Sequence, residues 1–243
     1  MTDRAVNLWI GCTSRRFLED TLRSLEKIMA SMGTSLEIVD DTDDYCCGSV
    51  LYTTGQEKDA NAVMERTEGL LSEKHVKSMV SFCAGCMRTF AERYTFSPSN
   101  PLETSLHVSQ YLVENLDRLH FRNDEPIVVT YHDPCHLGRH MEIFEEPRTL
   151  IRAVPNVTLE EMRHSMESSF CCGSGGGVRA LNKDMADSAS AIRVAEAKET
   201  GARYFITACP FCERSFRSAQ ESREGLDGIE VINLVDFLAR YLE

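Results

Sequence analysis

Ten cysteines divide this sequence into two matching halves. Each half has a single cysteine, then an adjacent pair followed by glycine, then a Cys-x-x-Cys pair. The members are Cys12, Cys46, Cys47, Cys83 and Cys86 in the first half, and Cys135, Cys171, Cys172, Cys209 and Cys212 in the second. Each position recurs after 123 to 126 residues. A repeat of this length predicts two similar domains, residues 1–122 and 123–243, that meet at the polar segment 122–126.

The hydrophobic pattern of each half predicts strands that alternate with helices. Short apolar runs indicate strands at residues 6–10, 36–39, 76–82, 127–131 and 204–207. Apolar residues at helical spacing indicate helices at 17–32, 56–72, 107–119, 184–200 and 233–242. Such alternation is typical of right-handed βαβ units. We therefore expect an α/β fold of two pseudo-symmetric, duplicated domains, each a small Rossmann-like parallel sheet flanked by helices.

Four of the cysteines closely follow a predicted strand. They are Cys12, Cys83, Cys135 and Cys209. Ligands of parallel sheets collect at the carboxyl ends of the strands. We therefore expect the five cysteines of each half to converge at that edge.

The charge and the N-terminus limit the class of protein. The net charge is −12 and the basic residues are dispersed, which argues against a nucleic-acid partner. No apolar run approaches the ~18 residues of a spanning helix, and Met1–Arg4 does not resemble the start of an export signal. The sequence therefore predicts a cytoplasmic protein, whose reduced thiols are available for metal or redox chemistry.

Three interpretations of each cysteine set are open. Disulfides fit poorly, because each set is odd in number and the cytoplasm is reducing. A zinc ion takes four ligands, commonly from two Cys-x-x-Cys pairs, whereas each half has one such pair and three further thiols. An iron–sulfur cluster presents several irons and suits adjacent cysteines, whose Cα atoms lie about 3.8 Å apart. The sequence favours the cluster.

Glycines beside the adjacent pairs agree with that preference. Gly48 and the run Gly173–Gly177 would let the backbone pass close to a cluster and direct N–H groups at its sulfur atoms. The same run lacks the Gly-Lys-Ser/Thr ending of a phosphate loop. The acidic run at 40–44 is interpreted as a solvated loop.

The cysteine pattern resembles a known family. The pattern Cys-xn-Cys-Cys-Gly-xm-Cys-x-x-Cys occurs twice. In the first copy 33 residues precede the adjacent pair and 35, glycine included, follow it, and in the second copy the numbers are 35 and 36. It resembles the duplicated CCG cysteine-rich domain, the catalytic module of heterodisulfide reductases in their B subunit and the C-terminal part of their D subunit. Relatives occur in glycolate oxidase, anaerobic glycerol-3-phosphate dehydrogenase and lactate-utilisation proteins. Residues 131–139 and 207–212 are also similar to the heterodisulfide reductase branch, and the layout is similar to that of a B subunit.

The resemblance implies a non-cubane [4Fe-4S] cluster in each half. Its ligands would be Cys12, Cys46, Cys47, Cys83 and Cys86 in one half and Cys135, Cys171, Cys172, Cys209 and Cys212 in the other. The implied enzyme is an oxidoreductase acting on sulfur groups, which reduces a disulfide of the coenzyme M and coenzyme B type or oxidises thiols. A small-molecule disulfide or thiol would lie between the clusters.

The resemblance also implies partners. They are a small ferredoxin-like iron–sulfur subunit of the C-subunit type and a larger flavin or membrane cytochrome complex, which leaves the chain in the cytoplasm or attached to a membrane through a partner. A second hypothesis is an electron-transfer subunit of a flavin-linked dehydrogenase for glycolate, lactate or glycerol 3-phosphate. A third is a zinc-stabilised binding protein.

Five further residues have two interpretations each. His132 and His136 flank the Cys135 loop and could donate a proton to a product thiolate, but a loop-stabilising role is favoured. His107 is interpreted as structural. Arg139 and Arg179 could hold an anionic substrate group, although ordinary surface arginines are favoured.

Overall fold

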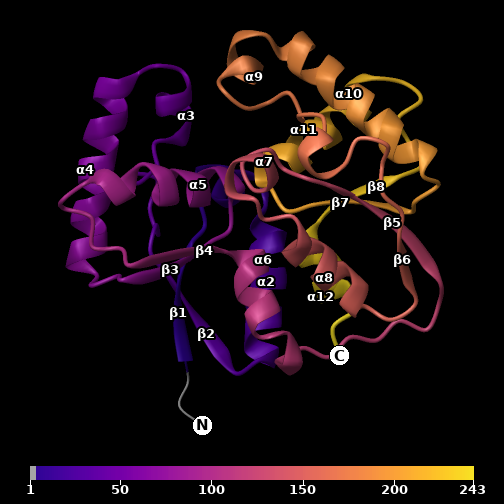
Figure 1. The fold of residues 1–243 in the computed structure, drawn as a ribbon, viewed down its shortest axis with the longest axis horizontal. Coiled ribbons are helices and arrows are strands. Elements are labelled where there is room, and N and C mark those ends of the chain that lie inside the picture. Colours follow the sequence, from indigo (N-terminus) through magenta and orange to yellow (C-terminus); the bar gives the residue numbers. More distant parts are fainter. Residues whose placement is uncertain (1–3) are drawn as a thin grey trace.

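The chain forms two parallel sheets of four strands each in the computed structural model, which describes residues 4–243 (Figure 1). The strand orders are β2-β1-β3-β4 and β6-β5-β7-β8. The first sheet holds β1 (Arg4–Trp9), β2 (Thr34–Ile38), β3 (Ser78–Ser81) and β4 (Thr104–His107). The second holds β5 (Ile127–His132), β6 (Val157–Leu159), β7 (Tyr204–Thr207) and β8 (Glu230–Asn233). The predicted fold of two pseudo-symmetric α/β halves is confirmed.

Helices flank both sheets. Those of the first half are α1 (Cys12–Phe17), α2 (Glu19–Ser31), α3 (Ser49–Thr53), α4 (Glu57–Glu73), α5 (Ala84–Glu92) and α6 (Val108–Glu114). Those of the second are α7 (Gly138–Met141), α8 (Glu145–Ala153), α9 (Val178–Leu181), α10 (Lys183–Glu199), α11 (Pro210–Ser222) and α12 (Leu234–Arg240). The predicted boundary at 122/123 stays a prediction. Of the segment Met1–Arg4, in which we expect no export signal, the first three residues lie outside the described range.

The two halves pack through equivalent helices. Helix α2 contacts α12 and helix α6 contacts α8, so each half contributes one helix to each pair (Figure 1). Thr21 Oγ1 donates a hydrogen bond to Asp236 at 2.7 Å, and Lys27 Nζ donates to the Ala239 carbonyl at 3.1 Å. The two helix pairs, α2 with α12 and α6 with α8, relate the halves by an approximate twofold symmetry.

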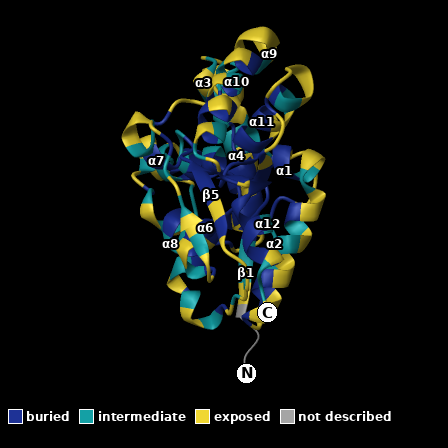
Figure 2. Ribbon diagram, turned by 90° about the vertical axis from the view of Figure 1, so that its right-hand side faces the viewer, coloured by how far each residue is buried: buried dark blue, intermediate teal, exposed yellow. Residues whose placement is uncertain are grey.

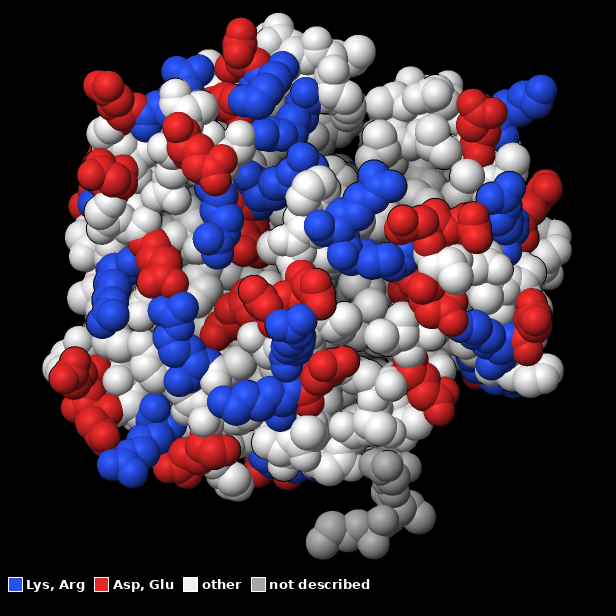
Figure 3. Space-filling model, turned by 180° about the vertical axis from the view of Figure 1, so that it is seen from behind, with Lys and Arg blue, Asp and Glu red and all other residues white. Residues whose placement is uncertain are grey.

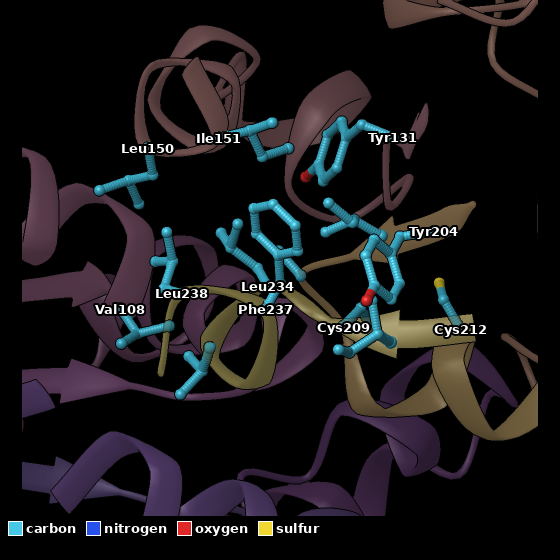
Figure 4. Close-up of a cluster of buried hydrophobic side chains, with 14 of the residues drawn as sticks. Val108, Tyr131, Leu150, Ile151, Tyr204, Cys209, Cys212, Leu234, Phe237 and Leu238 are labelled. Carbon is cyan, nitrogen blue, oxygen red and sulfur yellow. The ribbon is translucent and has the colours of Figure 1, made fainter. Parts of the chain in front are cut away.

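One hydrophobic core continues across this interface. Buried residues lie along the middle of the molecule and exposed ones on its outer helices (Figure 2). Leu238 of α12 lies between Val108 of α6 and Leu150 of α8, and Phe237 lies to the right of these three side chains (Figure 4). Burial of each such side chain contributes about 1.5–3 kcal/mol. The interface therefore fixes the position of one sheet relative to the other.

Three strands and the bounds of several helices differ from the sequence prediction. Strands β4, β6 and β8 hold only one or two apolar residues each, fewer than the apolar runs from which the equally short β3 and β7 were predicted. The helices predicted at 107–119 and 233–242 begin one residue later and end at Glu114 and Arg240. His107 and Asn233 end β4 and β8 and cap these helices instead, accepting from the N–H of Ser109 and Val235. The structure thus gives His107 the structural role expected of it.

The surface carries both signs of charge. Lys and Arg lie interspersed with Asp and Glu over the face shown in Figure 3, in agreement with the dispersed basic residues of the sequence. Within residues 4–243, no helix combines the length and apolar character needed to cross a bilayer.

Candidate metal centre

The cysteines lie at equivalent places of the two sheets. Cys12 begins α1 directly after β1, and Cys135 follows β5. Cys83 and Cys209 are the N-cap residues of α5 and α11, where the chain leaves β3 and β7. A Cys-x-x-Cys pair at a helix start places both side chains on one face, since residues three apart share a face. The predicted convergence at the carboxyl ends of the strands is observed.

The thiols contact one another in a single series. In the first half the order is Cys12, Cys46, Cys47, Cys86, Cys83, and in the second it is Cys135, Cys171, Cys172, Cys212, Cys209. The last thiols of the two series, Cys83 and Cys209, also contact each other. Because these two residues are equivalent, the approximate twofold axis passes between them.

A cavity of about 470 Å³ lies between the halves. Nine cysteines line it, and Cys171 is instead exposed on the outer side. The cationic side chains at its wall are Arg179, Lys183 and Arg214, and the described residues contribute no carboxylate to the lining. Arg179 and Lys183 share the carboxylate of Asp187, so three cations and one anion leave the wall with a net positive charge, although the chain as a whole has a charge of −12.

Backbone N–H groups reach the adjacent cysteines in both halves. The N–H of Gly48 donates to Cys46 Sγ, and that of Gly173 donates to Cys171 Sγ, both at 3.4 Å. Gly11 has φ +84°, and a Cβ there would lie 3.1 Å from Cys86 Sγ. The absence of a side chain at Gly11 thus lets Cys86 approach the Cys12 loop.

Contacts between the thiols lower the pKa of Cys47 and Cys83 in the first half and of Cys171 in the second. Hydrogen bonding by Cys46 and Cys86 lowers the pKa of Cys47 to about 6. Hydrogen bonding by Cys135 and Cys172 lowers the pKa of Cys171 to about 2. The thiolate is the form that binds a metal, so these contacts suit Cys47, Cys83 and Cys171 to the role of ligands.

Asp40 braces the Cys12 loop, a role that the solvated-loop interpretation of residues 40–44 missed. It is fully buried, and its two carboxylate oxygens accept from the N–H groups of Ile10 and Gly11, each at 2.8 Å. Arg15 lies 2.9 Å from the same carboxylate. Burial raises the pKa of Asp40 to about 6, opposed by these N–H groups and by Arg15. An acidic residue directly after a strand was the available signal.

Asp40→Ala is expected to lower the free energy of unfolding by about 3 kcal/mol, because two buried N–H groups lose their acceptors. Urea titration of the purified protein measures the loss. Asp41→Ala is the matched control, because Asp41 is exposed and pairs only with Lys74 at 3.2 Å. Equal stability of the two variants would refute the bracing role.

Two buried arginines brace the second half. Arg148 is fully buried and donates to both oxygens of Asp133, at 2.6 and 2.9 Å, and to Glu161. Arg193, also fully buried, donates to His132 Nδ1 and Ser169 Oγ, each at 3.2 Å. Asp133 and Ser169 lie beside the loops of Cys135 and Cys171. These arginines therefore connect both cysteine loops to α8 and α10.

The histidines and arginines considered from sequence lie in different places. His132 is fully buried and bonded to Arg193, as the loop-stabilising interpretation predicts. His136 lines the cavity, where burial lowers its pKa. Arg139 donates to the Ser169 carbonyl at 2.7 Å, outside the cavity lining. Arg179 lines the cavity and pairs with Asp187 at 3.0 Å.

The donor set fits an extended iron–sulfur group. In the part of the chain that the structure describes, no three Cys, His, Asp or Glu side chains surround a point closely enough for one metal ion. Five thiols in series, with backbone N–H groups directed at two of them, offer each half ligands for several irons. Residues that would hold such a group are thus present in both halves.

The fold and the site define a duplicated α/β protein with five thiols at one strand edge of each half. The family model for the cysteine-rich domain termed CCG matches twice, at residues 6–91 and 129–217. The chain therefore belongs to the CCG cysteine-rich domain family, and the resemblance inferred from its motifs is confirmed.

Curated relatives are components of oxidoreductases. The D subunit of the dihydromethanophenazine:CoB--CoM heterodisulfide reductase of Methanosarcina barkeri is 31% identical, over 96% of this chain and 58% of its own length. The B subunit of the fumarate reductase (CoM/CoB) of Methanothermobacter marburgensis is 29% identical, over 96% and 45%. The probable iron-sulfur-binding oxidoreductase FadF of Bacillus subtilis is 25% identical, over 89% and 31%. The chain thus spans about half the length of the first two and is related to iron–sulfur oxidoreductase subunits.

Proposed function

We propose that this chain is an iron–sulfur subunit that reduces a small disulfide, or oxidises the corresponding thiols, in the cavity between its halves. The proposed ligands of two non-cubane [4Fe-4S] clusters are the ten cysteines, five in each half. The observation that carries the proposal is the symmetric series of ten thiols, which meets at Cys83 and Cys209 beside one shared cavity. One redox group in each half, both beside this cavity, could supply the two electrons that reduction of a disulfide requires.

Such clusters, when bound, would supply one electron each and iron to stabilise each departing thiolate. The chain's own residues shape the space for the substrate. Arg179, Lys183 and Arg214 give the wall a positive charge, which favours a disulfide or thiol that carries an anionic group. His136 lies on the same wall, next to Cys135, within the space where a product thiol would need a proton.

A second candidate is an electron-transfer subunit in which the clusters relay electrons without binding substrate. It is favoured by two relatives whose names do not include a disulfide: FadF, and EtfAB:quinone oxidoreductase of Syntrophomonas wolfei, which is 24% identical over 97% of this chain and 34% of its own length. In either case we propose that a ferredoxin-like iron–sulfur subunit or domain delivers the electrons, within a flavin-containing or membrane-attached complex.

Electron paramagnetic resonance separates the two candidates. Protein prepared without oxygen and then oxidised is expected to give a new paramagnetic signal when a small anionic thiol is added, because the thiolate binds a cluster in the cavity. Neutral thiols of equal size should require higher concentrations. A protein that contains iron but shows no thiol-dependent signal, while still passing electrons from a flavin donor to a quinone, would contradict the catalytic proposal and support the relay.

A further inference from the structure

The two halves share an aromatic ring at an equivalent place behind their cysteines. Trp9 is the last residue of β1, three positions before Cys12, and His132 is the last residue of β5, three positions before Cys135 (Figure 1). Trp9 pairs in register with Ser81, and His132 pairs with Thr207. The two rings are therefore related by the duplication, although the residues differ.

The surroundings of the two rings match as well. Trp9 meets the ring of Phe90 edge to face, with centroids 5.0 Å apart and planes at 79°. His132 meets Phe216 in the same way, at 4.8 Å and 85°. Phe90 and Phe216 occupy equivalent positions of α5 and α11, the helices that carry the Cys-x-x-Cys pairs.

Both rings lie next to the thiols of their own half. Trp9 is fully buried in a core shared with Cys47, Cys83 and Cys86. Phe216, the ring that holds His132, is buried in a core that includes Cys172, Cys209 and Cys212. Trp9 is thus packed with thiols of the first set, and His132 lies near enough to Cys171 for the charge of that thiol to oppose the lowering of the His132 pKa.

What indole and imidazole have in common here is a buried N–H without an acceptor. Among the described residues, no hydrogen-bond partner lies within reach of Trp9 Nε1 or His132 Nε2. His132 Nδ1 accepts from Arg193 Nε, which leaves the ring proton on Nε2. Burial and the charge of Arg193 also lower the pKa of His132, so the ring is neutral and Nε2 is a donor. An unpaired buried donor destabilises the fold, and two at equivalent positions call for a shared reason.

We propose that the ring N–H groups of Trp9 and His132 each donate a hydrogen bond to a sulfur atom of the cluster in their own half, and that Arg193 positions the second by holding the proton on His132 Nε2. This inference rests on the proposed function, because it requires the clusters. Hydrogen bonds to cluster sulfur raise the reduction potential, since they stabilise the more negative, reduced form. The two donors therefore set the two potentials independently.

Trp9→Phe keeps an aromatic ring against Phe90 and removes only the N–H-bearing part. It is expected to make reduction of the first-half cluster about tenfold less favourable, which is ~59 mV for a one-electron couple. The second-half cluster should be unchanged and serves as the internal control. His132→Phe should show the opposite selectivity. Potentiometric titrations followed by paramagnetic resonance measure both potentials, and iron analysis checks that both clusters are retained.

The unaltered protein provides a test that does not depend on how variants fold. Trp9 is the only tryptophan of the chain, so tryptophan labelled with ¹⁵N marks one site. Electron–nuclear double resonance on the paramagnetic first-half cluster should then show a ¹⁵N coupling that Trp9→Phe lacks. Full iron content with no coupling and unchanged potentials would overturn this inference alone. An iron-free native protein would overturn both the inference and the proposed function.

Discussion

Replacing Cys46 and Cys47 together by serine is expected to halve the iron content, from about eight to about four atoms per chain. The two thiols stand in the middle of the first series, between Cys12 and Cys86, so their loss separates Cys12 from the Cys83 and Cys86 pair and leaves three thiols. Three such thiols are too few for the proposed cluster. Anaerobic purification followed by iron and sulfide analysis measures the effect.

The second half offers the matched variant. Cys171→Ser with Cys172→Ser should also remove about half of the iron, and each pair of substitutions should abolish the paramagnetic signal of its own half only. The thiol-dependent signal should disappear in both, because the proposed reaction needs a redox group on each side of the cavity. Retention of all the iron in either variant would contradict the assignment of these cysteines as ligands.

Arg148→Met is expected to lower the free energy of unfolding by about 3–5 kcal/mol, because it leaves the buried carboxylate of Asp133 without its charged partner. Arg148 and Asp133 are 0% and 2% exposed. For a chain of this size, the loss corresponds to a fall in melting temperature of roughly 10 °C. Calorimetry of the variant, with and without iron, measures it.

The control lies one turn further along the same helix. Arg152 is exposed and pairs with Glu145 at 3.4 Å, so Arg152→Gln should change stability by less than about 1 kcal/mol. Adding Asp133→Asn to Arg148→Met should recover much of the loss, because the buried charge is then removed. If Arg148→Met proved as stable as Arg152→Gln, the buried ion pair would not hold the Cys135 loop as we describe.

The central strands and the cysteine sets at their carboxyl ends were predictable from sequence because their signals are local. Apolar runs marked β1, β3, β5 and β7, the central strands of the two sheets, and the cysteines that follow them could be placed at one edge by the geometry of parallel sheets. The short edge strands β4, β6 and β8 were missed. One or two apolar residues in each of them form no recognisable run, and only pairing with a neighbouring strand defines them.

The residues that support the site escaped prediction because their partners are distant in the chain. Asp40 is 30 residues from Ile10, and Arg193 is 61 residues from His132. Trp9 and His132 share no side-chain type, so the duplication of residues did not reveal them as a pair. Only the matching contacts with Phe90 and Phe216 did.

The sequence by itself determined that the chain is a duplication and that each half gathers five thiols at the end of a parallel sheet. Spacing along the chain is sufficient for that inference, because each strand, turn and helix start is a local unit. The tertiary structure decided that the two sets face each other. Packing of α2 on α12 and of α6 on α8 brings Cys83 and Cys209 into contact and closes the cavity, and such packing depends on surfaces that no local pattern encodes.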